Sequence, residues 1–264
     1  MITTGTKGIC RLALMPVRAA AADTSEQVTQ LLFGEHYEIL EISKNQKWFR
    51  IRINYDGYEG WVDHRQHTTI SDAYYDQINI SNYKVCLELT TTILYQKQAL
   101  QILIGSVLPI STNEIFKMEE QLAFNGDAKG LGQRMGYEYL RNVALKYLNS
   151  PYMWGGRSPF GIDCSGFTQI IYRIAGYSLL RDASQQATQG REIKNLSEAR
   201  PGDLAFFKND SGKIYHVGMI MEDRQIIHAS GRVRIDQLDE QGIRVESSGE
   251  YTHFLSSIRR ILKN

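Results

Sequence analysis

The chain has few cysteines and few prolines. Three cysteines, Cys10, Cys86 and Cys164, and five prolines occur among 264 residues. An odd number of widely separated cysteines without a Cys-x-x-Cys pair fits neither a disulfide framework nor a zinc ribbon. The cysteine usage therefore indicates a reducing compartment, and we expect a cytoplasmic protein.

The chain also lacks an excess of charge of either sign. Thirty Lys and Arg residues against 29 Asp and Glu residues leave a formal net charge of +1. A protein that binds nucleic acid or an anionic membrane usually carries a basic surplus. We therefore expect no nucleic-acid partner.

Long hydrophobic runs are missing as well. No stretch approaches the ~18 consecutive apolar residues of a membrane span, so we expect no span. Residues 8–22 resemble a signal peptide, but Arg11, Pro16 and Arg18 interrupt the apolar run. We interpret this segment as part of the mature fold. A leader removed upstream would instead place the protein in the periplasm or outside the cell.

Glycine and tyrosine are abundant. The chain holds 22 Gly and 15 Tyr, with 42% hydrophobic and 22% charged residues overall. Ordinary hydrophobic content predicts a folded protein, and many glycines beside many tyrosines indicate turn-rich β structure. At roughly 100–200 residues per domain, the length suggests about two domains, or three if some are small.

The first half of the chain has the pattern of short strands. Polar and apolar residues alternate with a period of two, and clusters of Asn, Lys, Asp and Gly separate the alternating segments, which are residues 9–14, 37–42, 48–53 and 57–62. This pattern predicts a small SH3-like barrel over residues 1–75. Apolar segments at 86–89 and 102–110 predict a second SH3-like barrel over 76–128, and the Gly-rich residues 125–132 indicate a linker.

The period changes after the linker. Tyr137, Leu140, Val143 and Tyr147 share one helical face, and Pro151 ends the pattern. Phe167, Ile170, Ile171 and Ile174 predict a second helix that begins near Asp163 and ends before Gly176. Strands are predicted at 203–207, 213–221 and 225–229, with Asp203 as a turn residue. Residues 129–264 are thus expected to form one α+β domain.

Cys164 stands at the start of the second predicted helix. Asp163 occupies the expected N-cap position, so Cys164 lies in the first turn, where unpaired N–H groups and the helix dipole favour a thiolate. A thiolate is the nucleophilic form of cysteine. The alternative is a free cysteine packed as a small hydrophobic residue, as we expect for Cys10 and Cys86.

A cysteine nucleophile needs a base, and His216 and His228 are the candidates. If residues 213–221 and 225–231 form a hairpin with residues 222–224 as its loop, Gly218 lies opposite His228 and His216 lies diagonally from it. A two-residue loop would put the two histidines on opposite faces. His36, His64, His67 and His253 are expected to be half-buried or solvated histidines.

These residues resemble a known family. Its ordered blocks are Asp163-Cys164-Ser165-Gly166-Phe167, Ala199-Arg200-Pro201-Gly202-Asp203-Leu204, His216-Val217-Gly218-Met219 and Ile227-His228-Ala229-Ser230. Together they resemble the NlpC-type, papain-like cysteine peptidases of bacterial cell-wall metabolism, over about residue 133 to the end. The segments 25–35, 57–61 and 151–158 are similar to those of the γ-D-glutamyl-L-diamino-acid endopeptidases within this family.

The resemblance implies a mechanism and a substrate. Cys164 would attack the γ-glutamyl carbonyl of a peptidoglycan stem peptide, His216 would carry the proton, and His228 would orient His216. Residues that would bind the small peptide substrate are Glu26 and Tyr58 of the first barrel and Tyr152, Trp154, Asp163, Ser165, Asp182 and Ser184 of the catalytic domain. No cofactor and no metal are implied, and a monomer is expected.

Three alternatives stay open from the sequence alone. The protein could be a wall-peptide binding module without activity, or a related cell-wall amidase or acyltransferase that uses the same Cys-His pair. A zinc site formed by Cys164, His216 and His228 is the third, although no short ligand pair and no fourth ligand are evident. Whether the diamino acid would be lysine or meso-diaminopimelate is also open.

Overall fold

The structure is a computed structural model that describes residues 2–80, 83–110, 116–117, 121–245 and 248–263. The chain divides into two compact units, Met1–Gln133 and Arg134–Asn264. The division lies a few residues after the sequence-predicted start of the catalytic domain at residue 129. Among the described residues, no helix is long and apolar enough to cross a membrane.

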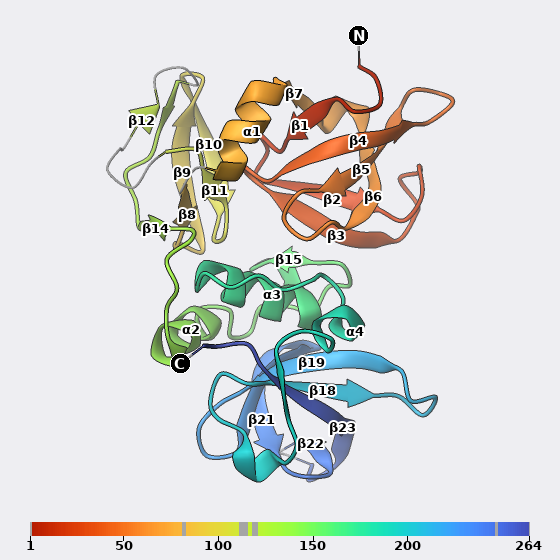
Figure 1. The fold of residues 1–264 in the computed structure, drawn as a ribbon, viewed down its shortest axis with the longest axis vertical. Coiled ribbons are helices and arrows are strands. Elements are labelled where there is room, and N and C mark those ends of the chain that lie inside the picture. Colours follow the sequence, from red (N-terminus) through yellow and green to blue (C-terminus); the bar gives the residue numbers. More distant parts are fainter. Residues whose placement is uncertain (1, 81–82, 111–115, 118–120, 246–247, 264) are drawn as a thin grey trace. The chain divides into compact units, whose positions relative to one another are not determined.

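The first unit begins with an antiparallel sheet of seven strands in the order β3-β2-β6-β5-β4-β1-β7 (Figure 1). Its strands are β1 Lys7–Ile9, β2 Leu14–Arg18, β3 Gln27–Leu32, β4 His36–Ile42, β5 Trp48–Ile53, β6 Glu59–Asp63 and β7 Thr68–Ile70, with a 3₁₀ turn at His64–Gln66 between the last two.

Alternating side chains explain this sheet. In β4 and β5 the apolar side chains of Tyr37, Ile39, Ile51 and Ile53 point into a common core, while intervening charged residues face outward. Such alternation is what a sheet with one buried face requires. The predicted strand at 9–14 is wrong in its extent, because the backbone breaks after Ile9 and the next strand starts only at Leu14.

A helix that the sequence pattern missed follows the sheet. Helix α1 spans Asp72–Ile80 and buries only Ile78 among its residues. With so little apolar surface it has almost no helical period, which is why periodicity did not reveal it. The predicted boundary between the two barrels, after residue 75, falls inside this helix.

The second part of this unit contains two small sheets, β10-β9-β13-β12 and β11-β8-β14. Their strands are β8 Lys84–Cys86, β9 Thr90–Tyr95, β10 Gln98–Leu103, β11 Val107–Leu108, β12 Phe116–Lys117, β13 Leu122–Ala123 and β14 Ala128–Gly130. The predicted strand at 102–110 is interrupted between β10 and β11 by a turn at Gly105.

A repeated corner relates the two β regions of this unit. In the first, Gly34 donates its N–H to the carbonyl of Cys10 at 2.9 Å; in the second, Gly105 donates to the carbonyl of Cys86, also at 2.9 Å. Both glycines have positive φ, and both cysteine thiols donate to the carbonyl two residues further on. The two β regions thus share this corner, and a second SH3-like barrel over 76–128 stays a prediction.

The second unit combines helices with a second, larger sheet. Its helices are α2 Tyr137–Leu145, α3 Cys164–Ile174 and α4 Ala183–Gln186, with a 3₁₀ turn at Leu196–Glu198. Its strands are β15 Arg157–Ser158, β16 Gly161–Ile162, β17 Arg191–Ile193, β18 Leu204–Lys208, β19 Ile214–Ile220, β20 Gln225–Ser230, β21 Arg232–Leu238, β22 Gly242–Arg244 and β23 Tyr251–Arg260.

The larger sheet closes on itself. It has the order β17-β23-β18-β19-β20-β21-β22, and β22 also pairs with β23, so the strands from β23 to β22 form a barrel. Helices α3 and α4 pack against β19, and Figure 1 shows them on one side of this barrel. The predicted α+β arrangement of helices followed by antiparallel strands is therefore confirmed.

Asp203 directly precedes β18 and binds Arg260, the last residue of the neighbouring strand β23. It accepts the N–H of Arg200 at 2.8 Å, as a turn residue should, and forms a bidentate ion pair with Arg260 at 2.8 and 2.7 Å. Both side chains are buried, so the charges compensate each other where water cannot. The prediction of a turn role for Asp203 is confirmed.

The corner at Gly34 gives a test of the first unit. A Cβ at Gly34 would lie 1.9 Å from the Val107 carbonyl oxygen, whereas a Cβ at Gly5, which has a similar positive φ, would meet nothing within 4 Å. We expect Gly5→Ala to cost about 1 kcal/mol from backbone strain. Gly34→Ala should cost about 1–3 kcal/mol more because the neighbouring strand must move. Urea denaturation measures both; equal losses would contradict this account.

Candidate active site

Cys164 is the first residue of α3. Asp163 is the N-cap, with extended backbone, and its carboxylate accepts the N–H of Gly166 at 2.6 Å, so the predicted cap is confirmed. Every residue of α3 is buried, which fixes the helix between the barrel and the rest of the unit. The Cys164 thiol is 6% exposed and donates to the carbonyl of Tyr215 on β19 at 3.9 Å.

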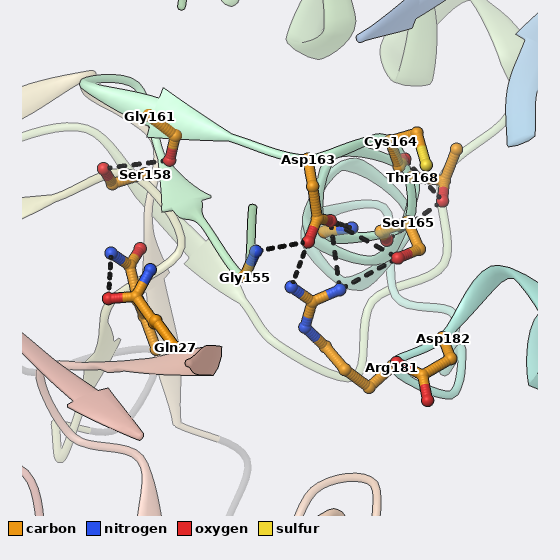
Figure 2. A network of polar contacts seen from close by, with 12 residues as sticks. Gln27, Gly155, Ser158, Gly161, Asp163, Cys164, Ser165, Thr168, Arg181 and Asp182 are labelled. Carbon is orange, nitrogen blue, oxygen red and sulfur yellow. Dashed lines mark hydrogen bonds and ion pairs between the residues drawn. The ribbon is translucent and has the colours of Figure 1, made fainter. Parts of the chain in front are cut away.

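The Asp163 carboxylate is the centre of a buried polar network (Figure 2). Arg181 forms a bidentate pair with it at 3.0 and 2.6 Å, and the N–H of Gly155 donates to it at 2.8 Å. Ser165 adds a hydrogen bond at 3.3 Å and also accepts one from Arg181. The predicted site residues Asp163 and Ser165 are thus held by protein donors, and they fix the turn that carries Cys164.

The two histidines lie in the predicted register. Gly218 is paired with His228 across β19 and β20, and Nε2 of His216 lies 2.8 Å from Nδ1 of His228. The three-residue loop is therefore confirmed over the two-residue alternative. A Cβ at Gly218 would lie 2.7 Å from Cδ1 of Ile226 and 2.9 Å from Cβ of His228, so the glycine leaves room for the side chains of β20.

The thiol lies beside the strand that carries His216. Strand β19 has an irregular register opposite β18, where Phe207 pairs with His216 and Lys208 with Ile214, so Tyr215 has no partner there. Bulges of this kind redirect backbone groups near functional sites. The Tyr215 carbonyl turns to the Cys164 thiol, and the Val217 N–H also faces the thiol, so the sulfur contacts both neighbours of His216 in the chain.

Two further residues of this cluster were not assigned from the sequence. Asp236 on β21 lies with Oδ2 2.9 Å from Nε2 of His228. His253 on β23 is 8% exposed, and its ring centroid lies 4.1 Å from that of His216, which corrects the expectation of a half-buried or solvated histidine. Extending the hairpin by one strand would have revealed Asp236, because β20 and β21 are joined by a tight turn at Gly231. Nothing in the sequence spacing indicates His253.

Burial dominates the proton affinities of the site. It raises the pKa of the Cys164 thiol to about 12, and the Asp163 charge adds to this, against the smaller opposing effect of backbone N–H groups. Burial, together with His228, His253 and Arg234, holds the pKa of His216 well below its usual value. Burial therefore disfavours the charged form of both groups, and for the thiol it opposes the effect of the helix start.

The other predicted substrate residues of this unit surround the same helix start. Tyr152 is 36% exposed, and burial, Cys164 and Asp163 raise the pKa of its hydroxyl. Trp154 is 61% exposed and precedes Gly155, whose N–H binds Asp163. Asp182 directly follows Arg181 and begins α4, where its N–H donates to Gln185, and Ser184 is exposed in the same short helix.

Glu26 and Tyr58 belong to the first unit and are described within it. Glu26 is exposed just before β3, and its carbonyl accepts the N–H of Ala19 at 2.9 Å. Tyr58 precedes β6 and packs partly against the barrel core. Since Arg18 pairs with both Gln27 and Trp61, the two predicted residues flank the same stretch of the barrel.

The third alternative from the sequence was a zinc site. Over the ranges that the structure describes, no group of three or more His, Cys, Asp and Glu side chains is arranged to hold a metal ion. The imidazoles of His216 and His228 bond to each other through Nε2 and Nδ1.

A cysteine at a helix start, packed against an antiparallel barrel that carries a histidine pair, is the arrangement of papain-like cysteine peptidases. Residues 149–249 match the NlpC/P60 family, and residues 17–66 match the bacterial dipeptidyl-peptidase SH3 domain. The chain is 30% identical over 251 residues to the γ-D-glutamyl-L-lysine dipeptidyl-peptidase of Bacillus cereus, which covers 84% of this chain and 73% of that protein. The chain therefore belongs to the NlpC/P60 family.

Other relatives agree with this assignment. Dipeptidyl-peptidase 6 of Lysinibacillus sphaericus is 28% identical over 243 residues, covering 82% of this chain and 86% of that one. The crystal structure of an NlpC/P60 family protein from Bacillus cereus has a TM-score of 0.82 at 21% identity and covers 98% of this chain and 100% of that one. At this identity the structural match shows the fold.

The Asp163–Arg181 pair gives a test of the site's scaffold. We expect Arg181→Gln to destabilise the second unit by about 3–5 kcal/mol, because it leaves a buried carboxylate without its cation. Asp163→Asn should have a similar effect on Arg181. The double variant should lose clearly less than the sum of the two, since neither charge is then unpaired. Urea denaturation of the three variants measures this; additive losses would show that the pair is not coupled.

Proposed function

We propose that this protein is a cysteine peptidase that hydrolyses the γ-D-glutamyl-L-diamino-acid bond of free peptidoglycan stem peptides. One observation carries the proposal: the Cys164 thiol lies against both chain neighbours of His216, and His216 is hydrogen-bonded to His228. Cys164 is then the nucleophile, His216 the base and His228 the group that orients the base. The relatives named as γ-D-glutamyl-L-lysine dipeptidyl-peptidases support the choice of bond.

The first half of the reaction forms an acyl-enzyme. Nε2 of His216 bonds to His228, so Nδ1 is the nitrogen left to accept the Cys164 proton. The sulfur then attacks the γ-carbonyl carbon of the D-glutamyl residue and forms a tetrahedral intermediate. When the carbon–nitrogen bond breaks, His216 gives its proton to the leaving α-amine of the diamino acid, and the γ-glutamyl group stays on sulfur as a thioester.

The second half releases the dipeptide. Water loses a proton to Nδ1 of His216 and attacks the thioester carbonyl, and the returning proton restores the Cys164 thiol. Because burial disfavours both the thiolate and the imidazolium, we infer that the base takes the proton during the attack rather than beforehand. The products are L-Ala-γ-D-Glu and the rest of the stem peptide.

The helix start supplies donors for the developing oxyanion. The N–H of Cys164 belongs to the first turn of α3, whose N–H groups have no partners within the helix. The Tyr152 hydroxyl lies close enough to Cys164 for the two groups to interact electrostatically, and its raised pKa keeps it protonated. We assign the oxyanion to these two donors.

Selection of free stem peptides would come from recognition of the terminal amine. A protonated amine binds best to carboxylates and hydroxyl oxygens. We assign this role to Asp182 within the catalytic unit. Glu26 and Tyr58 lie within the residues that match a bacterial dipeptidyl-peptidase SH3 domain. Both Asp163 oxygens already accept protein donors, so Asp163 serves the scaffold.

Mass spectrometry of a synthetic tripeptide tests the proposal. The protein should convert L-Ala-γ-D-Glu-L-Lys, or its meso-diaminopimelate counterpart, to L-Ala-γ-D-Glu. Cys164→Ala should abolish turnover, whereas Cys10→Ala, which alters a buried thiol outside the catalytic unit, should retain it. An N-acetylated tripeptide should react at least about tenfold more slowly. Cleavage by Cys164→Ala, or none by the wild type, would refute the assignment.

The acid limb of the pH profile is a second test. Burial holds the pKa of His216 well below the usual 6.5, so the imidazole stays unprotonated as the pH falls through that value. Since only the neutral imidazole accepts the thiol proton, kcat/KM should be retained at pH 6.5 and decline only at lower pH. Rates measured from pH 4 to 9 decide this. A half-maximal rate at pH 6.5 or above would contradict the buried, neutral base.

A further inference from the structure

We propose that Asp236 is a positioning residue that sets the proton arrangement of the His216–His228 pair and thereby leaves Nδ1 of His216 as the catalytic lone pair. This inference rests on the proposed function, since it concerns the base of the same reaction. It adds a fourth member, from β21, to the series formed by Cys164, His216 and His228.

The geometry is a continuous line of hydrogen bonds across three strands. Nε2 of His216 lies 2.8 Å from Nδ1 of His228, and Nε2 of His228 lies 2.9 Å from Oδ2 of Asp236. His216 is diagonal to His228 on β19, and Asp236 is diagonal to it on β21, where Arg234 is the direct partner. Each step uses the side-chain neighbour that an antiparallel register brings close.

The direction of the bonds follows from the carboxylate. An ionised carboxylate only accepts hydrogen bonds, so Nε2 of His228 must carry its proton. A neutral His228 then has a bare Nδ1, which must accept the proton on Nε2 of His216. A neutral His216 is thereby left with a bare Nδ1. The acceptor at one end of the line therefore determines which nitrogen of His216 is free at the other.

Asp236 is built to stay ionised. Burial raises the pKa of its carboxyl, but the hydrogen bond from His228 and the nearby Arg234 outweigh this and bring the pKa below its usual value. Nε of Arg234 lies 2.8 Å from the same Oδ2. The carboxylate also offers a negative charge to the imidazolium that forms when His216 accepts the thiol proton.

No other described group near His228 can perform this role. The charged and titratable groups that face it are His216 on β19, Arg234 and Asp236 on β21, and His253 on β23, whose ring lies 5.7 Å away. Arg234 is a donor only, and burial lowers the pKa of His253 to about 4. Asp236 is the one acceptor among them that cannot itself donate at neutral pH.

Asp236→Asn is the direct test. The asparagine amide can donate to Nε2 of His228, which reverses the line and places the proton on Nδ1 of His216. We expect kcat for the tripeptide to fall by on the order of 10²- to 10⁴-fold with KM changed less than about threefold, as for the wrong tautomer in a serine-protease triad. Asp236→Glu keeps an acceptor, so its kcat should be at least about tenfold higher than that of Asp236→Asn. The matched control is Asp223→Asn, an exposed turn residue, which should match the wild type.

Two readouts do not depend on the peptide substrate. Histidine ¹⁵N NMR of the wild type should show both His216 and His228 protonated on Nε2, and Asp236→Asn should move both protons to Nδ1. Alkylation of Cys164 by iodoacetamide at pH 7.5, followed by mass spectrometry, should slow in Asp236→Asn and not in Asp223→Asn. The NMR spectrum also reports whether each variant is folded.

The outcomes separate the two proposals. If the wild type does not cleave the tripeptide but Asp236→Asn changes the tautomers and the alkylation rate, the proposed function fails and the role of Asp236 stands. A wild-type His216 protonated on Nδ1, or a folded Asp236→Asn protein with kcat within about threefold of the wild type, would overturn the role of Asp236.

Discussion

The buried ion pair between Asp163 and Arg181 is the interaction on which the site depends. Two arginine nitrogens, the N–H groups of Gly155 and Gly166 and the Ser165 hydroxyl converge on one carboxylate, which thereby joins a loop, a helix start and a distant arginine. A carboxylate removed from water requires such partners. The same charge raises the pKa of the neighbouring thiol, so the group that places Cys164 also opposes its ionisation.

The chemistry is divided between two layers of the catalytic unit. The helical layer supplies the nucleophile at the start of α3, and the barrel supplies the imidazoles on adjacent strands. The bulge at Tyr215 brings the layers together, since it directs a carbonyl of β19 to the thiol. Burial opposes the charged forms of both the thiol and the imidazole that these two layers supply.

Local patterns predicted much of this arrangement. The helix over 164–174 followed from its apolar period and its cap, and the relation of His216 to His228 followed from counting residues around one hairpin. Helix α1 was not predicted, because it buries a single residue and its apolar residues hardly follow the helical period. Arg181 directly precedes the predicted residue Asp182. Its ion pair with Asp163 spans 18 positions of the chain, and hydrophobic periodicity cannot reveal a contact of that kind.

His253 could not have been found by such counting. It reaches His216 from a strand that pairs with β17, β18 and β22 rather than with β19, so no single hairpin leads from one histidine to the other. Asp236 was not predicted, but it could have been, because counting residues around the hairpin of β20 and β21 leads from His228 to it. Positions related by one turn were accessible from sequence, and a position related only through strands far apart in the chain was not.

That closure also affects how the enzyme can move. Both neighbours of β19, and both neighbours of β20, are paired strands within a barrel without a free edge, so the backbone of the histidines is tied on each side. Displacing His216 would require breaking ladder hydrogen bonds on two sides at once. We therefore expect a rearrangement that admits a peptide or releases a product to occur outside these paired strands, which hold the base in place.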